Sequence, residues 1–155
     1  MANSRFSIAV HTLGLLAHGD GAKPLKSEYL ACLVKTNPVV IRRLLSDLAS
    51  ANLVVSQAGA TGGTRLAKKP EEIDLFEIYR AVEGGAIFAL HRHKPDAHCN
   101  IGRSIQTVLC AIQDKLDAAV EDKLGQITLA DVLKMIKQEN ENCQAKFKKG
   151  ESDLK

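Results

Sequence analysis

The segment Thr36–Pro70 combines a proline-started helix with two short β-forming stretches, and no other pattern in the sequence restricts the fold as strongly. Asn37 is suited to cap this helix and Pro38 to occupy its first position, and the helix is expected to end near Asn52. The stretches LVVS, from Leu53, and TRLA flank the turn sequence GATGG, which predicts a β-hairpin. The chain is therefore expected to contain a helix that runs directly into a hairpin.

Two further helices are expected before this segment. The first is predicted between Ser4 as its cap and Gly19–Gly21 as its stop. Its apolar residues recur at three- and four-residue spacing: Phe6, Ala9, Val10, Leu13, Leu16 and Ala17. Ser27 is suited to cap the second helix, whose apolar residues are Tyr29, Leu30, Leu33 and Val34. Three helices and a hairpin, with a turn between the second and third helices, predict a winged helix-turn-helix.

A fourth helix and a polar loop follow the hairpin. Asp74 and Glu77 have the spacing of a capping box, and Gly84–Gly85 is suited to end the helix that the box begins. The apolar residues of this helix are Leu75, Ile78, Tyr79 and Val82. The sequence HRHKPDAHCN then predicts a loop, because it is polar and interrupted by Pro95.

The segment Ile101–Leu124 predicts one long helix with a continuous apolar stripe. Part of this stripe alternates steps of four and three, the spacing at which paired helices contact each other: Ile105, Leu109, Ile112, Leu116 and Ala119. We call these five residues the seam and expect them to form a homodimer interface. Thr128 and Asp131 are suited to cap a further short helix, and the polar chain beyond Glu139 predicts a frayed tail.

Charge is unevenly distributed along the chain. Residues 1–69 hold nine basic side chains against three acidic ones, a net charge of +6, whereas the whole chain carries +3. A basic first half favours a polyanionic partner for that half. On the third helix, Arg42 and Arg43 fall outside the predicted buried stripe of Val40, Ile41, Leu44, Leu45 and Leu48. Arginine on an exposed helix can contact guanine edges in the major groove, and Arg65 near the hairpin tip can reach a minor groove. The pattern therefore favours double-stranded DNA as the partner.

The sequence resembles the IscR/NsrR/CymR-type family of bacterial winged-helix transcription regulators. The matching segments run in order from Ser4 to Val132: SRFSIAVHTLGLLA, TNPVVIRRLLSDLASANLV, GATGGTRLAKKPEEIDLFEIYRAVE, CNIG and ITLADV. The resemblance implies a homodimeric transcriptional regulator, acting as a repressor, that binds a palindromic operator. It assigns the recognition helix and the wing to DNA contacts through Ser27, Asn37, Pro38, Val39, Arg42, Arg43, Gly62, Gly63 and Arg65.

The resemblance also implies divisions of the chain. Residues 1–83 would be the DNA-binding domain, and 84–100 a sensor-type loop. Residues 101–138 would hold the long dimerisation helix with a short C-terminal helix, and 139–155 the polar tail. The predicted fold class is thus mainly α with a small β-hairpin, a winged helix-turn-helix followed by a long dimerisation helix.

In the sensor-type loop the sequence departs from the family pattern. Relatives that bind an iron–sulfur cluster place three cysteines there, but only Cys99 is present here, with His93 and Ile87 at the other two positions. One cysteine does not provide the usual cluster ligands. His91, His93, His98 and Cys99 could instead bind zinc, or belong to a solvated loop. We expect no cofactor, and consider a redox-responsive Cys99 at a helix N-terminus the better hypothesis.

The remaining observations exclude several classes of protein. The four cysteines form no CxxC pair and no dense framework, so a disulfide-stabilised secreted domain is not expected. Cys32 and Cys110 are expected to be core thiols and Cys143 to lie in the tail. No apolar stretch has the length of a membrane span, and a cytoplasmic location is expected. There is no P-loop, GxGxxG or GxSxG motif, so we expect no enzyme and no catalytic residues. The alternative function is a winged-helix protein-interaction or metal-responsive adaptor that does not bind specific DNA.

Overall fold

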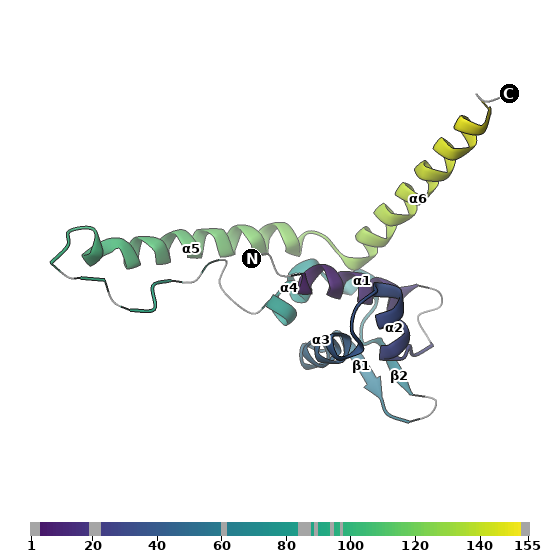
Figure 1. The fold of residues 1–155 in the computed structure, drawn as a ribbon, viewed down its shortest axis with the longest axis horizontal. Helices are drawn as coiled ribbons and strands as arrows, with labels where there is room; N and C mark the ends of the chain where they lie inside the picture. Colours follow the sequence, from purple (N-terminus) through teal and green to yellow (C-terminus); the bar gives the residue numbers. More distant parts are fainter. Residues whose placement is uncertain are drawn as a thin grey trace.

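The elements follow one another in the order of three α-helices, a hairpin, a short 3₁₀ helix and three further α-helices (Figure 1). The computed structural model describes residues 4–18, 23–59, 62–83, 88, 90–93, 95–96 and 98–152, with only the backbone of 145–152. The elements are α1 (Arg5–Ala17), α2 (Ser27–Val34), α3 (Pro38–Ser50), β1 (Val54–Gln57), β2 (Gly63–Leu66), the 3₁₀ helix η1 (Pro70–Glu72), α4 (Leu75–Glu83), α5 (Gly102–Gly125) and α6 (Leu129–Ser152). The predicted stops at Gly19–Gly21 and Gly84–Gly85 lie outside the described residues.

The hydrophobic core lies where α1, α2, α3 and α4 meet. Its fully buried side chains include Leu13, Leu30, Ile41, Leu48 and Ile78, one or more from each helix. The prediction that Val40 is buried was wrong, because its side chain is exposed; Tyr29 and Leu33 on α2 are exposed as well. Each lies at the margin of its helical stripe, so a small rotation of the helix leaves it in solvent; α2 turns Leu30 and Ala31 inward instead.

Helix α3 begins as its sequence predicts. The side-chain oxygen of Asn37 accepts a hydrogen bond from the backbone N–H of Val39 at 2.8 Å, and Pro38 occupies the first turn. Of the two predicted serine caps, Ser4 occupies the cap position of α1, whereas the prediction for Ser27 was wrong. Ser4 precedes α1 without capping it through its side chain, and Ser27 is the first residue of α2 rather than its cap.

Strands β1 and β2 pair in antiparallel register, with Val55 opposite Arg65 and Ser56 opposite Thr64. The segment before α2 joins this hairpin, because Leu25 exchanges two backbone hydrogen bonds with Thr64, at 2.9 and 2.8 Å. This contact fixes the hairpin relative to the first turn of α2. The hairpin is the predicted wing.

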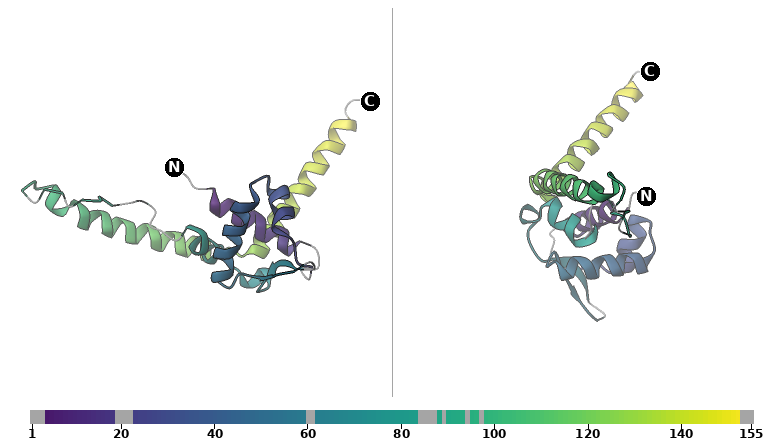
Figure 2. Two further views of the ribbon diagram at one scale, coloured as in Figure 1. Left: turned by 60° about the horizontal axis from the view of Figure 1, so that its bottom comes forward. Right: turned by 90° about the vertical axis from the view of Figure 1, so that its left-hand side faces the viewer.

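Helix α5 extends away from the body formed by α1–α4, and α6 projects from the body in another direction (Figures 1 and 2). The prediction of a short last helix and a frayed polar tail was wrong, since α6 continues to Ser152. Its Lys, Gln and Glu residues favour helix even where no face is buried. Within the described residues, no helix is long and apolar enough to cross a membrane.

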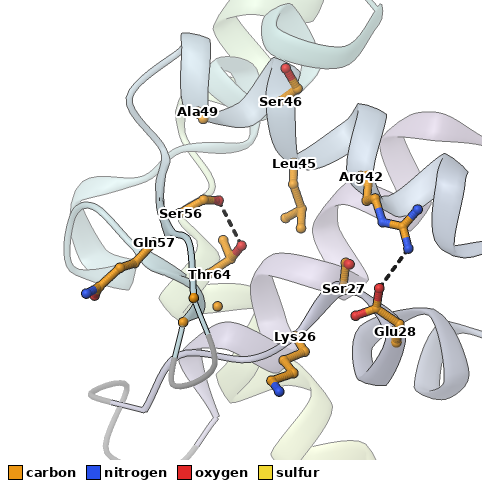
Figure 3. A pocket seen from close by; sticks show the side chains of 13 residues that line it. Lys26, Ser27, Glu28, Arg42, Leu45, Ser46, Ala49, Ser56, Gln57 and Thr64 are labelled. Atoms are coloured by element: carbon orange, nitrogen blue, oxygen red, sulfur yellow. Dashed lines mark hydrogen bonds and ion pairs between the residues drawn. The ribbon is translucent and has the colours of Figure 1, made fainter.

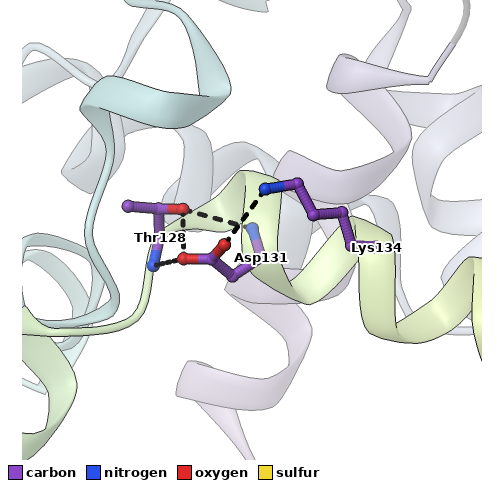
Figure 4. Close-up of polar contacts among 3 residues, drawn as sticks. All are labelled: Thr128, Asp131 and Lys134. Atoms are coloured by element: carbon purple, nitrogen blue, oxygen red, sulfur yellow. Dashed lines mark hydrogen bonds and ion pairs between the residues drawn. The ribbon is translucent and has the colours of Figure 1, made fainter.

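The predicted caps of α4 and α6 lie next to each other. Asp74 accepts a hydrogen bond from the Glu77 N–H at 2.7 Å, while the Glu77 side chain pairs with Lys68 instead of completing the box. Thr128 and Asp131 form the reciprocal box at the start of α6, as predicted: the Asp131 N–H donates to Thr128 Oγ1, and the Thr128 N–H donates to Asp131 Oδ2, both at 3.1 Å (Figure 4). An antiparallel bridge between Asp74 and Thr128 joins the two helix starts.

Candidate nucleic-acid interface

A groove of about 600 Å³ lies between the first turn of α2, the exposed side of α3 and the wing (Figure 3). Lys26 and Ser27 contribute from the start of α2, Arg42 and Ser46 from α3, and Gln57 from β1. Backbone N–H groups in the first turn of a helix have no partner within that helix and attract anions. The groove thus places two cationic side chains and a helix N-terminus on one open surface.

Arg42 does not project freely from α3. Its Nη2 atom lies 2.7 Å from Oε1 of Glu28 on α2, in an ion pair whose two side chains are 56% and 61% exposed. The hydrogen bond from Arg42 is the main reason that the pKa of Glu28 lies below its usual range. The pair therefore spans the edge of the groove with the carboxylate ionised at neutral pH.

Arg43 lies on the other side of α3. It lines a separate cavity of about 390 Å³ with Arg5, Val40 and Asp47, and Arg5 forms an ion pair with Asp47 there. Successive residues of a helix point about 100° apart, which separates the two neighbouring arginines. The structure brings Arg42 together with Ser27 and the wing, and it places Arg43 toward α1.

Two glycines allow close backbone contacts at the wing. A Cβ atom on Gly62 would lie 2.2 Å from the carbonyl oxygen of Gln57, and one on Gly63 would lie 2.9 Å from that of Leu25. Both distances are shorter than van der Waals contact allows. A side chain at Gly62 would therefore distort the wing itself, whereas one at Gly63 would push β2 away from the segment before α2.

The structure places Arg65 differently from the sequence prediction. It lies within β2, paired with Val55, rather than at the tip, and its side chain is exposed. Because alternate residues of a strand face opposite sides, Arg65 faces away from the side on which Ser56 and Thr64 line the groove. Asn37 and Val39 are exposed at the start of α3, and Pro38 is half-buried beside them.

Sequence reasoning missed Lys26 and Glu28 as members of this surface. Both neighbour Ser27, so their place beside a predicted helix start was the available signal. The ion pair itself had no local signal, because Glu28 and Arg42 are 14 positions apart on different helices. The contact between Leu25 and the wing was likewise unpredicted.

Two of the candidate sensor residues, His98 and Cys99, lie just before α5 begins at Gly102, the end of that helix farthest from the body (Figure 1). The Gly102 N–H donates to Cys99 Sγ at 3.4 Å, and this bond together with that of the Ile101 N–H lowers the pKa of the Cys99 thiol. Cys99 is exposed, as are His91, His93 and His98. In the described part of the chain no three His, Cys, Asp or Glu residues gather closely enough to hold a metal ion. Ile87 lies outside that part.

The other cysteines only partly match their predictions. Cys32 is exposed on α2, so its interpretation as a core thiol was wrong. Cys110 is half-buried and Cys143 is exposed. The reason for the error at Cys32 is that α2 buries Leu30 and Ala31, which leaves the following residue on the outer side of the helix.

The seam on α5 lies open in the single chain. Ile112 and Leu116 are 45% and 41% exposed, Ala119 is exposed, and Ile105 and Leu109 are half-buried. Gln113 is the one described residue of α5 that is buried, and its side-chain amide donates to the Phe88 carbonyl at 3.3 Å. An apolar stripe that its own chain leaves exposed is typical of a surface covered by another molecule.

A family model and a curated relative that are similar to this chain are both described as transcriptional regulators. The family model described as Rrf2, iron-dependent transcriptional regulator, matches residues 2–135. YwnA of Bacillus subtilis, described as an HTH-type transcriptional regulator, is 38% identical over 134 residues, which cover 86% of this chain and 97% of YwnA.

Solved structures show the same fold. A transcriptional regulator from Lactobacillus plantarum superposes with a TM-score of 0.72 at 27% identity, covering 98% of this chain and 99% of its own. T. potens IscR has a TM-score of 0.64 at 26% identity, covering 88% of each chain. CymR, the global cysteine regulator of B. subtilis, has a TM-score of 0.62 at 23% identity, covering 87% of this chain and 97% of its own, and this likeness concerns the fold alone.

Proposed function

This chain belongs to the Rrf2 family of helix-turn-helix transcriptional regulators, which are not enzymes, and on that premise we propose that it binds specific double-stranded DNA through the groove between α2, α3 and the wing. The observation that carries the proposal is the convergence of Lys26, Ser27 and Arg42 on one open surface. The start of α2 and Lys26 are suited to phosphates, and Arg42 is suited to a guanine edge.

The test is to select duplexes from a random-sequence library with the purified protein and to measure their Kd at several salt concentrations. We expect one sequence to be enriched, with affinity that falls steeply as salt rises, because lysine and arginine displace counterions from phosphates. The adaptor alternative predicts no enriched sequence and little dependence on salt. That outcome would overturn the proposal.

The protein is further proposed to act as a homodimer on a palindromic operator. The exposed seam residues Ile112 and Leu116 support this assembly, because a second copy of α5 would cover both stripes. A twofold dimer binds half-sites about one helical turn, roughly 34 Å, apart.

We propose that the protein represses transcription in the cytoplasm by covering promoter DNA. In vitro transcription from a promoter that carries the selected duplex should fall when protein is added; a rise would indicate an activator.

Cys99 is proposed to sense oxidants. The two N–H groups that lower its thiol pKa favour the thiolate, which is the nucleophilic form. The thiolate would attack a peroxide oxygen, breaking the O–O bond to give a sulfenic acid and hydroxide. Peroxide should change the affinity of wild-type protein for the selected duplex and leave that of Cys99→Ser unchanged. An equal response of both proteins would remove Cys99 from sensing.

A further inference from the structure

Glu28 occupies an unfavourable place for a DNA-binding surface. Among the described residues that line the groove it alone is acidic, and it lies next to Lys26 and Ser27 at the start of α2 (Figure 3). A carboxylate there repels any phosphate that approaches the helix start. Its ion pair with Arg42 does not explain it through stability, because pairs between side chains more than half exposed contribute little.

The contact does, however, determine where the Arg42 guanidinium lies. A hydrogen bond of 2.7 Å between Arg42 Nη2 and Glu28 Oε1 holds the end of a long side chain at the edge of the groove. A guanidinium has five N–H donors, so one bond to Glu28 leaves the others for a base edge. Without Glu28, the same side chain could turn toward the nearest phosphate, which every DNA sequence offers.

We infer that Glu28 is a positioning residue that raises sequence discrimination by holding Arg42 in the groove and by competing with phosphates for its guanidinium. The inference rests on the DNA-binding function proposed above. Phosphate contacts strengthen binding to all DNA, whereas base contacts strengthen binding to the operator alone. Glu28 thus lowers affinity for random DNA more than affinity for the operator, and specificity rises by the difference.

The experiment compares Kd values for the selected duplex and for a shuffled duplex of equal length, using wild type, Glu28→Gln, Arg42→Ala and the double variant. Glutamine keeps the length and the helix propensity of glutamate, so folding should be retained. We expect Glu28→Gln to bind the shuffled duplex about fivefold more tightly, with little change on the selected one. In the Arg42→Ala background the same substitution should leave the ratio of the two Kd values unchanged.

Glu139→Gln on α6 is the matched control, because it removes the same charge from an exposed position on the arm that projects away from the wing (Figure 1). It should leave both Kd values unchanged. The inference would be overturned if Glu28→Gln raised the affinity for both duplexes equally. It would also be overturned if Glu28→Gln changed the ratio of the two Kd values as much in the Arg42→Ala background as in wild type. If wild-type protein enriches no sequence at all, the proposed function itself fails, which is a separate result.

Discussion

At the scale of residues, Arg42 and Arg43 are adjacent in the chain but have different surroundings. Arg42 lies in the groove beside the start of α2, and Arg43 lies toward α1 near the Arg5–Asp47 ion pair. The same chemical group therefore lies on two sides of the helix that we propose binds DNA. We expect a base contact from the first and a phosphate contact from the second.

Replacing each arginine by alanine should separate these roles. Arg42→Ala should lose about 1–3 kcal/mol of binding free energy on the selected duplex and less on a shuffled one, because a base contact is lost. Arg43→Ala should lose equal amounts on both. Fluorescence anisotropy titrations with the two duplexes provide the measurement, and a uniform loss for Arg42→Ala would assign that side chain to a phosphate.

A second residue-scale prediction concerns the wing. Gly62→Ala would place a Cβ 2.2 Å from the Gln57 carbonyl oxygen, and we expect it to destabilise the protein by about 1–3 kcal/mol through forced backbone movement. Gly125→Ala is the control, because its Cβ would meet nothing within 4 Å. Urea unfolding measures both. If Gly62→Ala unfolds at the same urea concentration as wild type, the wing adapts freely.

At the scale of elements, local signals predicted helix starts well, but they did not predict exposed helix length or contacts between helices. Asn37–Pro38 specifies the start of α3 with its own side chains, so the sequence was sufficient there. The extent of α6 was missed because a polar run such as 137–144 suits both an exposed helix and a tail. The Glu28–Arg42 pair depends on how α2 and α3 pack, which no spacing within either helix encodes.

The capping box of α6 should respond to pH. Bonds from the Thr128 side chain and backbone lower the pKa of Asp131, so its folded-state pKa lies below the unfolded value of about 3.9. The stabilisation is therefore complete above about pH 4 and is lost as the pH falls through the folded-state pKa. Asp131→Asn should lower the urea midpoint at pH 7, and the difference from wild type should shrink at more acidic pH.

Asp114→Asn serves as the control, since it removes the same charge from an exposed position of α5. Its urea midpoint should follow that of wild type at both pH values. If Asp131→Asn lowers the urea midpoint by the same amount down to pH 2, the charge of Asp131 does not contribute to the stability that the capping box provides.

At the scale of the whole molecule, α5 carries the proposed dimer interface. The helix extends from the body with its seam exposed (Figures 1 and 2). Leu116→Glu would place a carboxylate among apolar residues of the proposed interface, where it has no partner. We expect a monomer by light scattering and a large loss of affinity for the selected duplex, because two half-sites are no longer bound together.

Ala118→Glu introduces the same charge on the opposite side of α5, where the side chain is exposed. It should remain a dimer and bind DNA as wild type does. Persistence of the Leu116→Glu dimer would exclude the seam as the interface.

In the proposed dimer, the length of α5 also determines which of the two DNA-binding domains would be affected by oxidation of a given Cys99. A 24-residue helix is about 36 Å long, with Cys99 at one end and the junction to α6 at the other. In the proposed dimer the two helices would cross near Ile112, the middle of the seam, so each Cys99 would lie roughly 18 Å beyond the twofold axis. In such a dimer it would lie nearer to the partner's DNA-binding domain than to its own. Sensing would then act in trans, because oxidation of Cys99 in one chain would alter the DNA contacts of the other chain. When oxidised by peroxide, a mixed dimer with a single Cys99→Ser chain would release one half-site.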